Sequence, residues 1–286
     1  MIQKIIDEVI TSETNEQRAL VTGLGITGWR SSGLGTCMRG RYLNRLLSGT
    51  GIKPEIDART LRVFEIGNQV EDWLMKKLNS PLQKEWVVYE QVEFFDPELN
   101  LSGHCDAYLV LVNVTGEVTK EYICECKSKH SKAFWYMDKK GEGAQVHHKM
   151  QLHSYMYMLN KYGGVIKNPD GSVKLKIEPR EGRLESGSIL YVSKDDMALL
   201  EYPIFANDTS LEKMWRFEIE TLNKCWEDKT APPPPEAGTW QEKYCEFCKL
   251  GLCGTLTDSK VKELFEIKQE PVKVSAEETV EEDCPF

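Results

Sequence analysis

Residues 103–127 read GHCDAYLVLVNVTGEVTKEYICECK, and this stretch decides the expected fold. Apolar and polar residues alternate on both sides of Thr115 and Gly116, a pattern that predicts an antiparallel β-hairpin. If Thr115 and Gly116 form a two-residue loop, counting outward from it places Asp106 directly opposite Glu125. Residues paired in this way have Cβ atoms about 5 Å apart. The hairpin therefore predicts two adjacent carboxylates.

The same alternation decides which side chains share a face of the hairpin. Successive side chains of a strand point to opposite faces, so Lys127 is expected beside Glu125 and Asp106. Cys124 and Cys126 then point to the other face. Two carboxylates this close raise a pKa unless a cation lies between them, and Mg2+ or Mn2+ suits carboxylate, carbonyl and water oxygens. The alternative is a surface hairpin with an ordinary cross-strand cluster of Asp, Glu and Lys.

A third carboxylate is expected from a helix upstream. Residues 58–78 carry apolar residues at helical spacing, and Glu71 lies in this segment one turn after Gly67. Because a glycine in mid-helix costs about 1 kcal/mol relative to alanine, we expect another backbone to approach Gly67 closely. A solvated glutamate beside a packing glycine is the alternative.

A second helix is predicted downstream, over residues 142–162. It carries His147, Gln151 and Tyr155 at intervals of four residues, which places them on one stripe. Polar and aromatic donors in a row suit contact with a phosphate backbone. Alone, such a stripe would also fit a core tyrosine with polar neighbours.

Taken together, these residues resemble the motif series of the PD-(D/E)xK nucleases, specifically the RecB-like branch: Glu71, Asp106, Glu125-Cys126-Lys127 and Gln151-x-x-x-Tyr155. The resemblance implies that Glu71, Asp106 and Glu125 bind Mg2+ or Mn2+ together with the backbone carbonyl of Cys126. It implies that Lys127 assists the attacking water, and that Gln151 and Tyr155 contact DNA near the scissile phosphate. Members of the branch often have histidine where this chain has Glu71. Glutamate also ligates metals, so the change bears on metal preference more than on activity.

Cysteine spacing gives a second signal. Cys245, Cys248 and Cys253 form a compact ligand loop beside two glycines, and Cys37 stands alone at the start of a basic, helix-like segment. Cys37 could supply the fourth ligand and tie the two ends of the chain together. The layout resembles the iron-sulfur nucleases of the same branch, the CRISPR-associated exonucleases and the AddB-type nuclease domains, which implies a [4Fe-4S] cluster. A structural Zn2+ ion is the first alternative, and unliganded or disulfide-linked thiols are the second.

The expected fold is α/β, with a restriction-endonuclease-like mixed central sheet flanked by helices. An iron-sulfur module liganded by cysteines would join its N- and C-terminal parts. We expect an N-terminal helix and Gly-rich connector over residues 1–35 and a nuclease core over residues 36–230. A Pro spacer with the cysteine module and a helix would span residues 231–267, and an acidic, disordered tail residues 268–286.

The net charge of the chain is −9, but two of its segments are basic. No acidic residue occurs between residues 17 and 54, and residues 127–149 contain six lysines. Phosphate backbones bind such local cations, and exposed aromatic rings stack on unpaired bases. A solvated basic face around buried aromatic residues is the alternative. The candidate DNA-binding residues are Arg39, Arg41, Arg45, Lys129, Trp135, Tyr136 and His147.

The acidic tail ends in Glu281-Glu282-Asp283-Cys284-Pro285-Phe286, which resembles the tip of bacterial single-stranded DNA-binding proteins. This resemblance implies docking to a recombination or repair partner, whereas a merely solubilising tail is the alternative. The first 17 residues lack the apolar core of a signal peptide, and no run of 18 apolar residues occurs. We therefore expect a cytoplasmic protein with no membrane contact and with reduced thiols.

These expectations combine into a metal-dependent DNA nuclease, most simply an exonuclease acting on single-stranded ends, as its CRISPR-associated relatives do. CRISPR adaptation proteins would then be partners. A phage-type recombination or repair exonuclease would use the same residues. A redox protein and a non-catalytic DNA-end-binding module are the alternatives from other classes.

Overall fold

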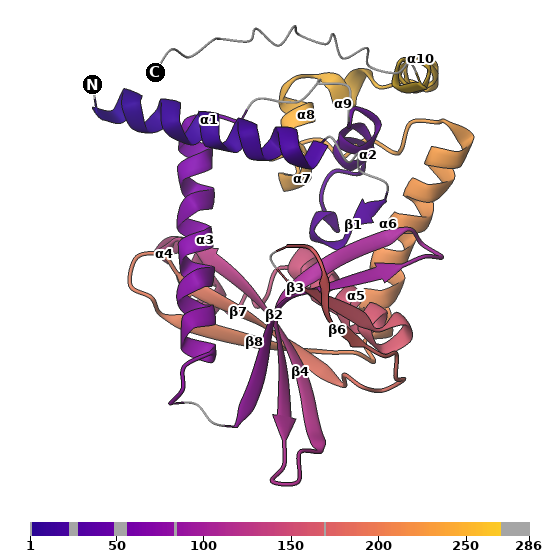
Figure 1. Ribbon diagram of the computed structural model, residues 1–286. Helices are drawn as coiled ribbons and strands as arrows, with labels where there is room; N and C mark the ends of the chain where they lie inside the picture. The colour runs from indigo at the N-terminus through magenta and orange to yellow at the C-terminus, as the bar shows by residue number, and fades with distance from the viewer. Residues whose placement is uncertain (1, 23–27, 49–55, 83–84, 169, 270–286) are drawn as a thin grey trace, which may run out of the picture.

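A mixed β-sheet forms the centre of the molecule (Figure 1). The structure is a computed structural model that describes residues 2–22, 28–48, 56–82, 85–168 and 170–269. Its strands are β1 (Trp29–Arg30), β2 (Trp86–Asp96), β3 (Leu101–Val112), β4 (Val118–Lys129), β5 (Gly164–Lys167), β6 (Val173–Ile177), β7 (Ser186–Ser193) and β8 (Leu199–Phe205). They follow the order β6-β5-β2-β3-β4-β7-β8, and β1 pairs with β3 beside this path. The β4–β7 and β1–β3 pairs are parallel and the others antiparallel, which confirms a mixed sheet.

Helices cover the sheet and extend beyond one end of it (Figure 1). They are α1 (Ile2–Thr22), α2 (Met38–Leu46), α3 (Ala58–Leu78), α4 (Ser131–Lys139), α5 (Val146–Tyr162), α6 (Thr209–Asp228), α7 (Trp240–Lys243), α8 (Glu246–Lys249), α9 (Leu252–Thr255) and α10 (Asp258–Gln269), with a 3-10 turn η1 at Ser31–Gly33. The short helices α7, α8 and α9 gather beside α2, at the end of the molecule away from the tip of the β3–β4 hairpin. Segments from near the two ends of the chain thus lie side by side.

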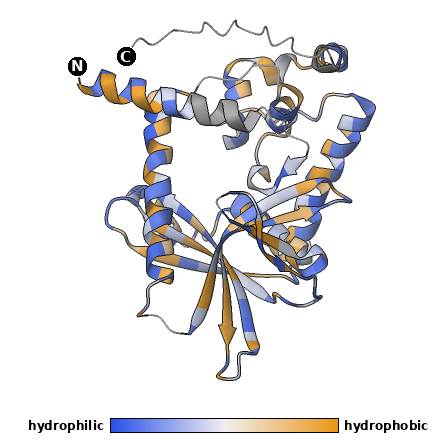
Figure 2. Cartoon of the chain, viewed as in Figure 1, coloured by the Kyte–Doolittle hydropathy of each residue, from blue (hydrophilic) through white to orange (hydrophobic). Residues whose placement is uncertain are grey.

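Two apolar clusters lie on opposite faces of the sheet. The larger one contains Met156 of α5 and Trp215 of α6 together with Ile123 of β4. The smaller one contains Leu74 of α3 and Cys124 of β4. Hydrophobic and hydrophilic residues alternate along α3 and α6 (Figure 2), as expected of helices with one face on protein and the other in water.

The β3–β4 hairpin has the predicted pairing but not the predicted turn. Ala107 pairs with Cys124, which places Asp106 next to Glu125 as expected. The two-residue loop was wrong: the N–H of Asn113 donates to the carbonyl of Glu117, which leaves three residues, 114–116, in the loop. A register shift between Leu111 and Val112 compensates for the extra loop residue. Without this bulge, every side chain of one strand would face the wrong side of the sheet.

Most predicted elements are present with small changes at their ends. The helix over residues 58–78 has the predicted bounds. The helix expected from residue 142 begins at Val146, four residues later. Part of the expected connector, Trp29–Arg30, forms β1. Nearly all of the acidic tail, including the Pro285-Phe286 tip, lies outside the described residues.

Within the described residues, no helix has the length and apolar character needed to span a bilayer.

Candidate functional site

Glu125 is the most deeply buried carboxylate of the predicted site. Its Oε1 atom accepts a hydrogen bond from Lys127 Nζ at 2.6 Å and another from Gln151 Nε2 at 2.6 Å. Its Oε2 atom is also buried, yet it has no hydrogen-bond partner among the described residues. An oxygen left unpaired in a protein interior is costly. This orphaned atom therefore fits a site that receives a further ligand.

Asp106 lies beside Glu125 on the neighbouring strand. Its Oδ2 atom accepts the backbone N–H of Cys126 at 2.6 Å, which bridges β3 and β4 at the site. Burial raises the pKa of Asp106. Burial also raises the pKa of Glu125, and the nearby Asp106 carboxylate raises it further, to about 8.

Glu71 reaches the same place from α3. Burial and then the charge of Asp106 raise the pKa of Glu71 to about 7. Gln91 of β2 donates its Nε2 hydrogen to Glu71 Oε1 at 2.7 Å. Gln91 has a φ of +51°, a left-handed conformation that is unusual for a residue other than glycine. Gln91 was not among the predicted site residues, because neither the strand pattern nor the residue type indicates a left-handed backbone conformation there.

Lys127 places an ammonium group among these acids. Burial alone would lower its pKa, but the carboxylates of Glu125 and Asp106 outweigh burial and raise it. The lysine therefore stays positively charged at neutral pH. We name Glu71, Asp106, Glu125 and Lys127 the carboxylate cluster. The four cysteines described below, and not these acids, are the group of described side chains whose ligand atoms already lie close enough together to hold a metal ion.

The donor set of the carboxylate cluster suits a hard divalent cation. It offers carboxylate oxygens from three elements, excess negative charge and the orphaned Oε2 atom of Glu125. A bound cation would lower the pKa values of these acids because it favours their ionised forms. The residues present therefore fit Mg2+ or Mn2+.

Gln151 and Tyr155 lie next to the cluster on α5, and both are buried. Besides its bond to Glu125, Gln151 Nε2 donates to the Tyr155 hydroxyl oxygen at 2.8 Å. The Tyr155 ring fits only because residue 103 is glycine: a Cβ atom at Gly103 would lie 2.3 Å from Tyr155 Cε1. Of the predicted stripe, Gln151 thus contacts Glu125, and Tyr155 contacts Gln151.

The third member of that stripe, His147, lies between two distant segments. Its ring stacks on Trp240 of α7 with 4.7 Å between centroids, and a Cβ atom at Gly35 would lie 2.7 Å from its Cβ atom. Burial, with the charges of Lys129 and Lys127, lowers the pKa of His147 to about 4. His147 is thus a neutral ring at the edge of the carboxylate cluster. Trp240 was not among the predicted site residues.

Three other predicted DNA-binding residues lie on or near α4. Trp135 is 47% exposed and Tyr136 is 37% exposed, and their rings contact each other edge to face. Lys129 donates from Nζ to Gln145 Oε1 at 2.7 Å, and burial lowers its pKa to about 8. The helix that follows β4 in sequence thus carries two exposed aromatic rings.

The three predicted DNA-binding arginines of α2 have partners inside the protein. Arg39 donates to the backbone carbonyls of Pro232 and Cys253. Arg41 forms an ion pair with Glu218 at 2.8 Å. The Arg45 guanidinium lies 4.0 Å from the ring centroid of Trp226 and 4.4 Å from that of Trp29. These contacts hold α2 against the C-terminal half of the chain. The three arginines are therefore not included in the proposed DNA-binding surface.

Four cysteines form a second candidate metal site, as predicted. The sulfur atoms of Cys37, Cys245, Cys248 and Cys253 all lie within 4.8 Å of one another, and we name them the cysteine cluster. The closest pairs are 3.7 Å, 3.8 Å and 3.9 Å apart. Hydrogen bonds from Cys253 and Cys37 lower the pKa of Cys245, which favours the thiolate form that binds metals. The cluster could bind a metal ion.

The absence of a side chain at Gly40 leaves room for the sulfur atom of Cys245 in the cysteine cluster. A Cβ atom at this position of α2 would lie 2.6 Å from Cys245 Sγ, closer than real Cβ contacts. The prediction that Gly67 admits another backbone was wrong by contrast, since a Cβ atom there would meet only the Ser128 hydroxyl oxygen at 3.5 Å. Gly40 lies in the first turn of α2 and Gly67 in the middle of α3, and the sequence offered no signal that Gly40 would be the one in close contact.

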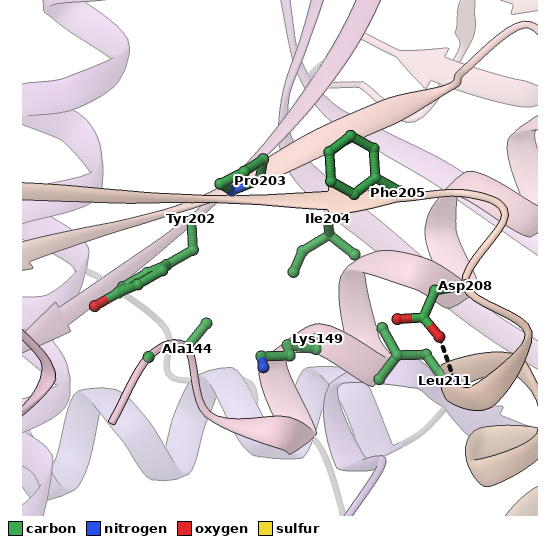
Figure 3. Close-up of a pocket in the computed structure, with 9 residues that line it drawn as sticks. Ala144, Lys149, Tyr202, Pro203, Ile204, Phe205, Asp208 and Leu211 are labelled. Carbon is green, nitrogen blue, oxygen red and sulfur yellow. Dashed lines mark hydrogen bonds between the residues drawn. The ribbon is translucent and has the colours of Figure 1, made fainter. Parts of the chain in front are cut away.

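A separate pocket with a cavity volume of about 200 Å³ lies between β8 and the first turns of α5 and α6 (Figure 3). Tyr202 and Ile204 extend into it from the strand toward Ala144 and Lys149. The Oδ1 atom of Asp208 at its rim accepts the N–H groups of Ser210 and Leu211 at the start of α6. None of the residues predicted for the nuclease site lines this pocket.

Comparison with known proteins assigns this chain to no family. The chain matches no family model, and no curated protein matches it. One similar solved structure is described as "Crystal structure of SSO0001"; it has a TM-score of 0.47 and 16% sequence identity, and the alignment covers 87% of this chain and 96% of that one.

Proposed function

We propose that this protein is a metal-dependent DNA nuclease with a restriction-endonuclease-like fold of the RecB-like PD-(D/E)xK type. The observation that carries the proposal is the carboxylate cluster with the unpaired Oε2 atom of Glu125. Three acids and one lysine converge there from a helix and two strands. An ordinary surface cluster of charges would be solvated, whereas burial raises the pKa values of these acids.

Each residue of the cluster has a role in phosphodiester hydrolysis. Glu71, Asp106 and Glu125, with the backbone carbonyl of Cys126, would hold Mg2+ or Mn2+. Such an ion activates a water molecule and neutralises charge on the phosphate. Lys127 is held charged by Glu125 and Asp106, so it would stabilise the negative charge that develops on the phosphate. An ammonium in this state donates hydrogen bonds to the attacked phosphate and does not serve as the base.

The proposed substrate is DNA with an unpaired end. Trp135 and Tyr136 offer exposed rings close after the catalytic strand, and stacking on such rings needs bases that are not paired. Lys129 would contribute positive charge between these rings and Lys127. A role in CRISPR adaptation, or in phage recombination or repair, belongs to the same proposal, as does a cytoplasmic location.

The cysteine cluster belongs to the proposal as a structural metal centre. The sequence resemblance favours a [4Fe-4S] cluster. A single Zn2+ ion is the alternative, because sulfur atoms bound to it tetrahedrally at about 2.3 Å lie about 3.8 Å apart, which matches the closest separations here. Iron analysis and a visible absorption spectrum of protein purified without oxygen distinguish the two.

The nuclease proposal is tested with end-labelled single-stranded DNA and Mg2+ or Mn2+. We expect wild-type protein to degrade the DNA and Lys127→Ala to lose about 100- to 1,000-fold in rate. Lys120→Ala is the matched control, because Lys120 lies on the same strand but is exposed near the hairpin tip. Absence of cleavage by wild-type protein with any metal or DNA substrate, combined with DNA binding, would instead indicate a non-catalytic DNA-binding module.

A further inference from the structure

The amide group of Gln151 has both of its N–H bonds engaged inside the protein. One donates to Glu125 Oε1 at 2.6 Å and the other to the Tyr155 hydroxyl oxygen at 2.8 Å. The amide oxygen is the part of the group that remains, and it can only accept hydrogen bonds. A phosphate oxygen also accepts hydrogen bonds. Gln151 in this arrangement therefore has no donor to offer a DNA phosphate.

Tyr155 is equally unsuited to contact DNA. Its side chain is 1% exposed, and its ring packs against Phe94 with 5.5 Å between centroids. On its other side the ring lies where a side chain at Gly103 would be. Tyr155 is thus fixed by the sheet, and its hydroxyl oxygen fixes the orientation of the Gln151 amide.

The result for Glu125 is an asymmetry between its two oxygens. Oε1 has two donors, Lys127 and Gln151, whereas Oε2 is buried without a partner. A carboxylate oxygen with two short donor contacts has little capacity left for a cation, and the other oxygen keeps all of its capacity. The hydrogen bonds also prevent rotation of the carboxylate.

We propose that Gln151 and Tyr155 are positioning residues, which hold Glu125 so that its Oε2 atom is the metal ligand, and that they do not bind DNA. This inference rests on the proposed nuclease function and replaces the DNA-contacting role that the sequence resemblance implied. Residues that orient a metal ligand contribute about 10- to 100-fold to metal affinity. Their effect should therefore appear in metal binding before any DNA is added.

The test compares Gln151→Met and Tyr155→Phe with Gln69→Met. Gln69 is a matched control because its amide also contacts a carboxylate, that of Glu65, but on the exposed side of α3. Mn2+ affinity is measured by titration calorimetry without DNA, and single-stranded DNA affinity by fluorescence anisotropy without divalent metal. Circular dichroism melting confirms that each variant is folded.

We expect Gln151→Met to weaken Mn2+ affinity about 10- to 100-fold, with DNA affinity within twofold of wild type. Tyr155→Phe keeps the ring but removes the hydroxyl oxygen, so it should weaken Mn2+ affinity by a smaller factor. Gln69→Met should change neither quantity. The opposite pattern, with DNA affinity lost and Mn2+ affinity unchanged, would overturn the positioning role and leave the nuclease proposal standing. Wild-type protein that binds no Mn2+ and cleaves no DNA would overturn both.

Discussion

The carboxylate cluster and the cysteine cluster are both candidate metal sites, but the protein holds them in different ways. The carboxylates are fixed by hydrogen bonds from neighbouring protein groups, among them Lys127, Gln151, Gln91 and the N–H of Cys126. The closest polar contacts of the cysteine sulfurs are mostly with one another, apart from the N–H of Gly40 on Cys37. Protein donors therefore orient the carboxylates, whereas the cysteine sulfurs lie within 4.8 Å of one another with few protein donors, and a bound ion would hold them together.

This difference separates the two expected roles of metal. An ion in the carboxylate cluster should contribute mainly to catalysis, because neighbouring protein groups already hydrogen-bond its ligands. An ion or metal cluster held by the cysteines should contribute mainly to folding, since Cys37 and the other three ligands come from opposite ends of the chain. Four measurements would test this comparison.

The largest effect is expected from removing a cysteine ligand. Cys253→Ser should abolish metal binding at the cysteine cluster and lower the melting temperature by about 10 °C or more, because structural metals of this kind contribute several kcal/mol to folding. Glu125→Gln, in the carboxylate cluster, should leave the cysteine-bound metal in place and shift the melting temperature much less. Metal analysis and thermal melting by circular dichroism measure both. Equal melting shifts for the two variants would contradict the proposed division of roles.

A second prediction changes the cysteine cluster without changing any cysteine. Gly40→Ala should lower the metal content markedly, because the added methyl group would lie 2.6 Å from Cys245 Sγ. Gly67→Ala is the matched control: its methyl group has room, and alanine should stabilise α3 by about 1 kcal/mol. Metal stoichiometry and melting temperature report the outcome. Full metal content in Gly40→Ala would show that the sulfur atoms have freedom to move apart.

A smaller effect is expected where the two sites are joined. Trp240 lies five residues before Cys245 and stacks on His147, which lies one helical turn before Gln151. Trp240→Leu should slow DNA cleavage about fivefold, equivalent to about 1 kcal/mol, while the cysteine cluster keeps its metal. Tyr244→Leu serves as the control, because Tyr244 is 75% exposed in the same module. If both variants cleave DNA at the wild-type rate, the two sites are independent.

The smallest effect concerns a part of α5 that belongs to neither site. His153 is buried and its Nδ1 atom accepts the Trp215 Nε1 hydrogen at 3.1 Å; burial lowers the pKa of His153. The unfolded chain gains a proton below about pH 6.5 and the native ring gains one less readily, so this residue's contribution to stability is present above that pH and decreases as the pH falls.

Between pH 7 and pH 5.5 wild-type protein should lose stability through His153, by no more than about 1 kcal/mol. Urea denaturation of wild type and His153→Gln at both pH values measures this loss, because glutamine keeps an acceptor but does not titrate. The variant should lose less stability than wild type over this interval. An equal loss in both proteins would mean that His153 becomes protonated in the native state.

Local periodicity made much of the fold predictable. The alternation along β3 and β4 determined that Asp106 lies beside Glu125, and the helical spacing of residues 58–78 determined α3. The intervals between His147, Gln151 and Tyr155, and between the three late cysteines, likewise indicated shared positions. Such patterns are visible in sequence because the repeat of a strand or helix fixes which neighbours share a face.

Only the tertiary structure decided which partner each of these side chains meets. The arginines of α2 contact Cys253, Glu218 and Trp226, which are all distant in sequence. A basic segment that suggested DNA binding therefore makes contacts within the protein. The same holds for Gln91 beside Glu71, for Gly40 against Cys245, and for the choice between the two oxygens of Glu125. Sequence determined which groups face a common side, because backbone periodicity is local. The pairing of long side chains depends on packing between distant segments, and that is settled only when the chain is folded.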